Sequence, residues 1–101
     1  MRVYLSKIAE TKLLELSNYL LEKWSVNVRD EFFNKLTNKL NQISSHPKSC
    51  SKSDNFNGLF KCVVSRQTTF YYRIHIKSQE IEVITFFDSR LSPDKLSTEI
   101  K

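Results

Sequence analysis

Apolar and polar residues alternate over residues 68–88, the stretch TTFYYRIHIKSQEIEVITFFD, as they do in two β-strands joined by a tight turn. With Ser78 and Gln79 as the loop, one face of this predicted hairpin carries mostly apolar pairs: Ile76/Ile81, Ile74/Val83, Tyr72/Thr85 and Phe70/Phe87. The other face carries mixed pairs, several of them basic: Lys77/Glu80, His75/Glu82, Arg73/Ile84, Tyr71/Phe86 and Thr69/Asp88. A slip of one residue would exchange the two faces, so the alternation predicts which side of the hairpin is buried.

The first half of the chain has the spacing of a short strand followed by two helices. Residues 2–6 alternate, and apolar residues then recur at helical spacing over residues 7–24. The predicted stripe of the first helix consists of Ile8, Leu13, Leu16, Leu20 and Trp24. Ser25 or Asn27 can cap a second amphipathic helix, which should end at His46 because a proline follows.

The second half of the chain is mostly strand. The polar stretch 47–57 predicts a loop, residues 59–65 a strand, and residues 92–101 one or two helical turns. We therefore expect an α+β fold of order β-α-α-β-β-β(-α), in which a two-helix antiparallel hairpin packs on one face of an antiparallel sheet. The first strand should join the edge of this sheet or pair beside one of its strands. The face away from the helices stays open to solvent.

Length and composition are those of one folded domain: 101 residues, 40% apolar, with a net charge of +5. No apolar run approaches the ~20 residues that span a bilayer, and no leader precedes Val3, so we expect a soluble cytoplasmic protein. Two cysteines could form a disulfide, but in that reducing compartment we expect Cys50 and Cys62 to remain free thiols. His46 and His75 have no Cys, His or carboxylate partner at ligand spacing, so the sequence predicts neither a metal site nor a cofactor.

The open face of the sheet is where we expect function. Its strands carry Lys61, Tyr71, Arg73 and His75, and Arg90 follows at the exit of the last strand. Each residue also has an ordinary structural explanation, such as a solvated strand position or a cross-strand pair. The positive net charge favours an acidic partner, either nucleic acid or an acidic protein segment.

Several stretches carry a pattern that extends over nearly the whole chain: VYLSKIAETKLLELSNYLLEKW, FFNKLTNKLNQISSHP, GLFKCVV, TFYYRIHIKSQEIEVITFFDSR and LSPDKL. Together they resemble the RelE/ParE superfamily of type II toxin–antitoxin toxins. The resemblance implies one bacterial toxin domain over residues 1–101, with roles in growth inhibition and plasmid stabilisation. It also implies a cognate antitoxin, which we expect to supply an acidic amphipathic segment that folds as it binds, in a hetero-oligomer.

Members of the superfamily that the chain resembles act by one of two mechanisms. RelE-like members cut messenger RNA on the ribosome without a metal, using cations that stabilise the scissile phosphate and groups that move protons. By position, Lys61 and Arg90 match the cationic set of these nucleases. Val63, Thr69 and Leu96 stand where the nucleases carry a lysine, an arginine and a tyrosine. Because each missing cation would contribute ~2–4 kcal/mol to transition-state stabilisation, this departure favours the ParE-like members, which inhibit DNA gyrase.

Three hypotheses for function remain open. The favoured one is a ParE-like inhibitor of DNA gyrase, which is not an enzyme, with Lys61, Arg73, His75 and Arg90 as its target-binding residues. The second is a RelE-like, metal-independent endoribonuclease that acts on mRNA at the ribosome, in which Lys61, Arg90, Arg73, His75 and Tyr71 supply a cation, an acid and a base. The third is a non-toxic binding module with the same fold.

Overall fold

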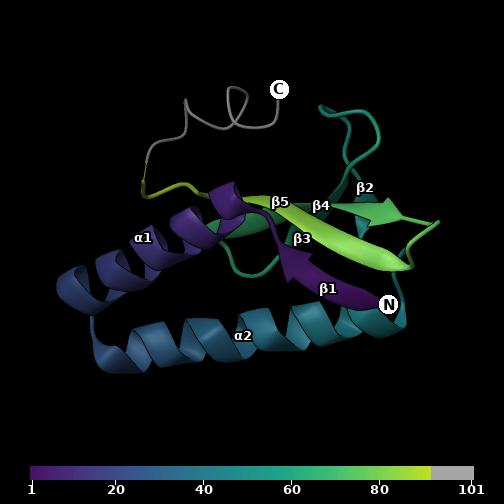
Figure 1. Ribbon diagram of the computed structural model, residues 1–101. Coiled ribbons are helices and arrows are strands. Elements are labelled where there is room, and N and C mark those ends of the chain that lie inside the picture. The colour runs from purple at the N-terminus through teal and green to yellow at the C-terminus, as the bar shows by residue number, and fades with distance from the viewer. Residues whose placement is uncertain (92–101) are drawn as a thin grey trace.

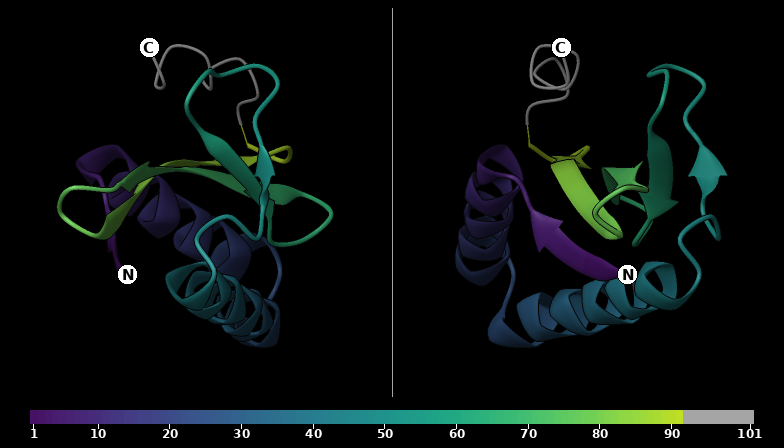
Figure 2. Two further views of the ribbon diagram at one scale, coloured as in Figure 1. Left: turned by 90° about the vertical axis from the view of Figure 1, so that its right-hand side faces the viewer. Right: turned by 45° about the vertical axis from the view of Figure 1, so that its right-hand side comes forward.

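The computed structural model in Figure 1 describes residues 1–91. In this part of the chain the elements are β1 (Arg2–Leu5), α1 (Lys7–Lys23), α2 (Val26–Ser45), β2 (Ser51–Lys52), β3 (Phe60–Val63), β4 (Thr68–His75) and β5 (Glu80–Asp88). The strands form one sheet in the order β1-β5-β4-β3-β2. Both helices lie on the same side of this sheet, which confirms the predicted α+β class (Figures 1 and 2). The helical turns predicted for residues 92–101 lie outside the described residues.

The sheet is mixed: the antiparallel pairing predicted for the last three strands is confirmed, whereas the first strand, whose pairing the sequence left open, is parallel to its neighbour. β1 runs parallel to β5, with Arg2 opposite Glu80 and Leu5 opposite Val83. The other neighbouring strands are antiparallel. In this direction the ladder between β1 and β5 continues into the start of α1, because the Ser6 N–H donates to the Val83 carbonyl at 2.9 Å. The first strand therefore joins the sheet edge, as expected, and also sets where α1 begins.

Both helices begin at a serine cap. Ser6 Oγ accepts the backbone N–H of Ala9 at 3.0 Å, and Ser25 Oγ accepts that of Val28 at 3.1 Å. Of the two caps that were predicted for α2, the first is the one used. This helix ends with His46 as its C-cap, in agreement with the prediction, because the residue before a proline avoids helical geometry. Neither α1 nor α2 has the length and apolar character that crossing a membrane requires; this statement covers residues 1–91.

The core lies between the helices and the sheet. On α1 it is reached by Ala9, Leu16 and Leu20, which are all at most 1% exposed. The predicted stripe included Ile8 and Trp24, but these side chains are 42% and 59% exposed. The prediction was wrong there: Ala9, beside Ile8, is the residue that enters the core, and Trp24 is the C-cap, where the backbone has already left helical geometry. The rest of the core consists of Phe32, Leu36, Ile43, Cys62, Val64, Phe70, Tyr72, Ile81, Val83 and Phe86.

The hairpin of β4 and β5 differs from the predicted register by two residues at its turn. Residues 76–79 form the connection, two residues more than predicted, and Arg73 therefore faces Glu82. Gln79 adopts a left-handed backbone with φ 56°, and its N–H donates to the Ile76 carbonyl at 3.2 Å. A shift of two residues keeps each side chain on its predicted face. It does place Ile76 in the turn, where it is 60% exposed instead of paired in the core.

A β-bulge in β5 changes the faces beyond this point. The opposing pairs on its two sides are Tyr72/Val83 and Tyr71/Thr85. Ile84 has no opposite residue, so the following side chains of β5 exchange faces. Phe86, which was predicted to lie beside Tyr71 on the open face, is buried in the core instead. The Ile84 carbonyl accepts a hydrogen bond from the Ser6 hydroxyl at 2.6 Å, so the cap of α1 also holds the bulge.

The stretch 47–57 was predicted as a loop, but it contains the short strand β2. Two hydrogen bonds flank β2: before it, the Tyr72 hydroxyl donates to the Pro47 carbonyl at 2.7 Å, and directly after it the Ser53 N–H donates to the Leu59 carbonyl at 2.8 Å. Figure 1 shows that the loop between β2 and β3 rises from the sheet on the side away from the helices. This loop therefore borders the open face.

Candidate functional site

The open face of β3 and β4 carries four of the five residues that were predicted as functional. Lys61 on β3 lies directly opposite Tyr71 on β4. Arg73 and His75 follow Tyr71 at intervals of two residues, so they lie on the same face. Lys61 and Arg73 are exposed to solvent, whereas Tyr71 is buried. The face therefore presents two exposed cations beside a covered phenol.

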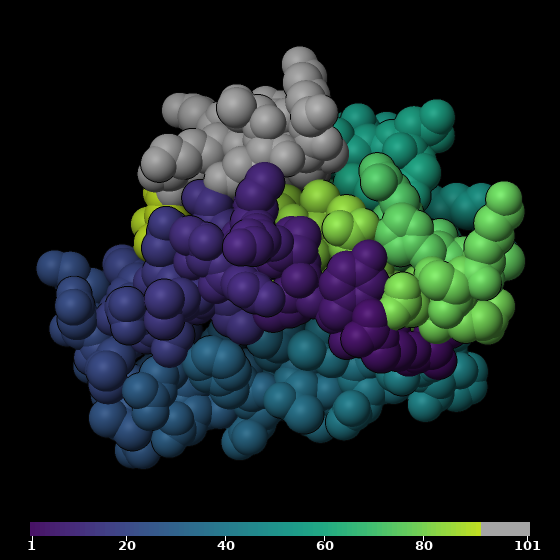
Figure 3. Space-filling view, viewed as in Figure 1, coloured from purple at the N-terminus to yellow at the C-terminus, as the bar shows by residue number. Residues whose placement is uncertain are grey.

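A hollow of about 360 Å³ adjoins Lys61 at the edge of the sheet. It lies between β3 and the loop that follows β2, and its lining consists of Ser51, Lys52, Ser53, Asp54, Asn55, Lys61 and Val63. In the space-filling view this loop projects from the body of the molecule (Figure 3). Lys52, which the sequence did not single out, also lines this hollow, although its register opposite Phe60 assigns it to the other face of the strand pair from Lys61. Two lysines and the carboxylate of Asp54 line the hollow, a net charge of +1, so the hollow is a weakly electropositive recess for a partner.

Phe56 covers Tyr71 on the open face. The two rings meet edge to face, with centroids 5.5 Å apart. This burial raises the pKa of the Tyr71 phenol above its ordinary value. The phenol is therefore protonated at neutral pH and can act as a hydrogen-bond donor. The only sequence signal for this contact was that Phe56 is the one aromatic residue of an otherwise polar stretch.

His75 is held by a carboxylate on the neighbouring strand. Its Nε2 lies 2.9 Å from Glu82 Oε1, which confirms the contact between these two residues that the sequence suggested. The residue directly opposite His75 is Glu80, so the contact with Glu82 is diagonal across the two strands. The carboxylate fixes the orientation of the imidazole ring. It also offsets part of the positive charge at this end of the face.

Arg90 lies on the other side of the sheet, apart from the four residues of the open face. Its Nε donates to Asp88 Oδ1 at 2.9 Å and its Nη2 to Oδ2 at 2.7 Å. The guanidinium carbon also lies 5.9 Å from the centroid of the Tyr19 ring on α1. The Asp88 carboxylate accepts two further hydrogen bonds, from the Arg90 backbone N–H at 2.9 Å and the Thr68 hydroxyl at 2.6 Å.

This ion pair changes the pKa of both partners. Burial has the largest single effect on Asp88 and raises its pKa, but the hydrogen bonds from Arg90 and Thr68 outweigh burial and lower the pKa below its ordinary value. The hydrogen bond to Asp88 is also the main cause of the raised pKa of Arg90. Asp88 is 4% exposed, so its charge has to be matched within the protein. The spacing of an acid two residues before an arginine was the signal in the sequence for this pair.

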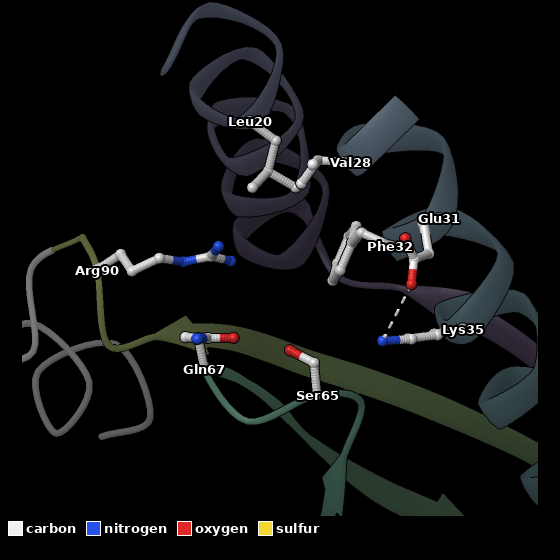
Figure 4. Close-up of a pocket in the computed structure, with 8 residues that line it drawn as sticks. All are labelled: Leu20, Val28, Glu31, Phe32, Lys35, Ser65, Gln67 and Arg90. Carbon is white, nitrogen blue, oxygen red and sulfur yellow. Dashed lines mark ion pairs between the residues drawn. The ribbon is translucent and has the colours of Figure 1, made fainter. Parts of the chain in front are cut away.

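Figure 4 shows a cavity beside Arg90, between the helices and the end of the sheet. Its volume is about 150 Å³, and it is lined by Leu20, Val28, Glu31, Phe32, Lys35, Ser65, Gln67 and Arg90. Lys35 Nζ lies 3.6 Å from Glu31 Oε1, so the second cation of the cavity is also paired. Apolar side chains from both helices close the cavity on one side. The position of Arg90 is therefore that of a residue joining the sheet to the helical layer.

Metal ligands do not converge in the described part of the chain. Within residues 1–91 no three His, Cys, Asp or Glu side chains lie close enough together to hold a metal ion. The open face presents exposed cations, a protonated phenol and an oriented imidazole. Such a face can bind an anionic partner, and its groups are also those used in proton transfer.

Comparisons with known proteins find likeness in the fold. No protein family and no curated protein matches the chain by sequence. Among solved structures, one from the chromosomal ParDE TA system of P. aeruginosa matches with a TM-score of 0.71 and 9% identity, over 87% of this chain and 95% of that chain. The free E. coli toxin RelE, as a double arginine-to-alanine mutant, gives a TM-score of 0.62 with 16% identity, over 98% of this chain and 92% of that chain. The isolated E. coli RelE toxin gives 0.60 with 15% identity, over 96% and 93%. The chain therefore has the fold of the RelE and ParE toxins.

Proposed function

We propose that this chain is the toxin of a type II toxin–antitoxin system, in which it arrests growth until a cognate antitoxin binds it. The observation that carries the proposal is the extent of the fold likeness. The matches cover at least 87% of this chain and at least 92% of each toxin-system chain. Nearly all of each chain lies within the match, so the likeness extends over the whole domain and not over a part of it. The exposed cations of the open face supply the site that such a function needs.

The position of Arg90 supports inhibition of DNA gyrase, the ParE-like activity, over cleavage of RNA. A cation that stabilises a scissile phosphate has to reach it. The Arg90 guanidinium is instead bonded to Asp88 and borders a cavity on the helical side. Of the two residues that match the nuclease cations by position, only Lys61 is then available on the open face. In this proposal the open face binds its target and does not cleave it.

Binding through this face depends on charge. Lys61 and Arg73 are exposed, and Lys52 lines the hollow beside Lys61. Such a surface attracts acidic partners over a distance of about 10 Å at moderate salt and loses this attraction as salt is added. We expect inhibition of gyrase by the purified chain to weaken at raised ionic strength for this reason.

A RelE-like nuclease is the second candidate, and the grouping of side chains on the open face supports it. Lys61 and Arg73 could stabilise the charge that develops on a phosphate. The protonated Tyr71 could donate to the leaving oxygen once Phe56 moves aside. His75, oriented by a carboxylate, could accept the proton of the ribose 2′-hydroxyl. This route requires no metal and does not use Arg90.

Induced expression in a bacterial host tests the proposal and separates the two activities. We expect wild-type chain to arrest growth and the double variant Lys61→Ala/Arg73→Ala to lose most of this effect. The matched control is Lys23→Ala, an exposed lysine at the end of α1. With purified chain, we expect loss of gyrase supercoiling and intact mRNA on translating ribosomes.

The outcomes distinguish the three hypotheses. Cuts in ribosome-bound mRNA with unchanged supercoiling would replace the gyrase inhibitor with the RelE-like nuclease. No growth arrest from well-expressed, folded chain would refute the toxin proposal and leave the non-toxic binding module. Equal toxicity of the double variant and Lys23→Ala would show that the open face is not the target-binding surface.

The proposed partner is an antitoxin with an acidic amphipathic segment. The net charge of +5 and the exposed cations of the open face favour such a segment electrostatically. Co-expression of the neighbouring open reading frame should restore growth, and the two chains should purify as one hetero-oligomer. If growth is not restored and no complex forms, that reading frame does not encode the partner.

A further inference from the structure

Cys50 and Cys62 face each other at the edge of the sheet. β2 and β3 are antiparallel, and their opposing pairs are Ser51/Lys61 and Lys52/Phe60. One further step in the same register places Cys50 opposite Cys62. Opposing residues of antiparallel strands have Cα atoms about 4.5–5.5 Å apart, and disulfides span Cα separations of about 4.4–6.8 Å. The backbone therefore already has the spacing that a disulfide needs.

Both cysteines are free thiols that pack against the same core cluster. Cys62 is 1% exposed, and Cys50 is half-buried against the same core cluster. Burial, followed by a hydrogen bond with the Cys50 thiol, raises the pKa of Cys62 to about 12. Cys50 is the more exposed of the pair and so the one that an oxidant from solvent meets first.

We propose that Cys50 and Cys62 are a modification site, which hydrogen peroxide converts to an intramolecular disulfide. The Cys50 thiolate attacks one peroxide oxygen, the O–O bond breaks, and the departing hydroxide takes up the thiol proton to become water, leaving Cys50 as a sulfenic acid. The Cys62 sulfur then attacks the Cys50 sulfur and the S–O bond breaks. The leaving hydroxyl group takes the Cys62 proton and departs as a second water. Two thiols and one peroxide thus give one disulfide and two waters.

The disulfide would tie together both ends of the segment that covers the open face. Residues 50–62 include Phe56, whose ring covers Tyr71. With the ends of this segment linked, the excursions that uncover Tyr71 become smaller and rarer. The thiols lie on the core side of the sheet, away from Lys61, so the proposed modification does not rest on the proposed function.

Peptide mapping of the oxidised full chain tests the proposal directly. The chain is treated with hydrogen peroxide, remaining thiols are alkylated, and the product is digested with trypsin without reduction. Cleavage after Lys48, Lys52, Lys61 and Arg66 separates the cysteines into residues 49–52 and 62–66. We expect these two peptides to be linked and to separate with dithiothreitol. The intact chain should remain monomeric and be lighter by two hydrogen atoms.

Two variants and one further measurement control for other oxidation products. Cys50→Ser should leave Cys62 reduced at the same peroxide concentration, because the more accessible sulfur is missing. Cys62→Ala should stop Cys50 at the sulfenic acid, which dimedone traps. Disulfide-linked dimers of the wild type, or Cys50 oxidised to sulfinic acid beside a free Cys62, would overturn the proposal without relying on either variant.

Amide hydrogen exchange tests whether the disulfide tethers the segment that covers Tyr71. Exchange over residues 53–59 should slow in the oxidised chain; unchanged exchange would overturn the tethering of this segment.

Discussion

Replacing Arg90 with alanine tests whether this residue serves the structure or the target. Arg90→Ala removes the guanidinium that pairs with the buried Asp88 and leaves the backbone in place. The carboxylate then keeps two of its four hydrogen bonds, those from the Arg90 backbone N–H and the Thr68 hydroxyl. We expect a folded but less stable chain.

The magnitude follows from the two hydrogen bonds that are lost. Hydrogen bonds to charged groups contribute about 1.5–3 kcal/mol each to stability. The Arg90 side chain is 21% exposed, so water replaces part of its role toward Asp88 in the variant. The two bonds sum to about 3–6 kcal/mol, and with a reduction for water we expect the free energy of unfolding to fall by about 2–4 kcal/mol. A small domain has about 5–15 kcal/mol in total, so the change is readily measured.

The same reasoning predicts the pH dependence. The pKa of Asp88 is lower in the folded chain than in the unfolded chain, so the folded state binds its proton more weakly. The stability that this gives is fully present above the unfolded Asp pKa of about 3.9 and is lost as the pH falls through the lower folded value. In urea unfolding, the difference in free energy of unfolding between wild type and Arg90→Ala should therefore be large at pH 7 and become smaller below about pH 4.

Arg66→Ala provides the matched control, because Arg66 is an exposed arginine in the turn between β3 and β4. Its loss should change the free energy of unfolding by less than about 0.5 kcal/mol. If Arg90→Ala is no more destabilised than this control at pH 7, or if its difference from wild type does not become smaller in acid, the structural role of Arg90 is refuted. Loss of toxicity in a fully stable Arg90→Ala would instead favour the target-binding role that the sequence predicted.

Two further substitutions test features that hold the sheet and its open face. Ser6→Ala should lower the free energy of unfolding by about 1–3 kcal/mol in urea titrations, because it removes both the cap of α1 and the donor to the Ile84 carbonyl; a change below about 0.5 kcal/mol would show that neither bond matters. Phe56→Ala should expose the Tyr71 phenol and lower its pKa toward the ordinary value in ultraviolet difference titrations. An unchanged pKa would mean that other groups bury Tyr71.

Elements that depend on neighbours in the chain were predictable. The apolar spacing placed α1 to within one residue at each end, and α2 ends at the predicted cap His46 and begins at Ser25, one of its two predicted N-caps. Alternation also placed Lys61, Arg73 and His75 on one open face, although their functional role is still a prediction. Helix periodicity, capping and strand alternation arise within a few residues, so a single sequence contains the information that they require.

Contacts between distant segments were decided by the tertiary structure. The bulge at Ile84 depends on a hydroxyl from Ser6, which no pattern within 68–88 reveals. The side of the sheet that Arg90 occupies follows from this bulge and from the buried Asp88 beside it. β2 is too short to have a sequence pattern, so the register that places its neighbour Cys50 opposite Cys62 came only from the structure. Strand register depends on the sum of contacts across the whole sheet and core. Local alternation therefore predicts which face of the sheet a side chain occupies, but not which residues of the neighbouring strand lie opposite it.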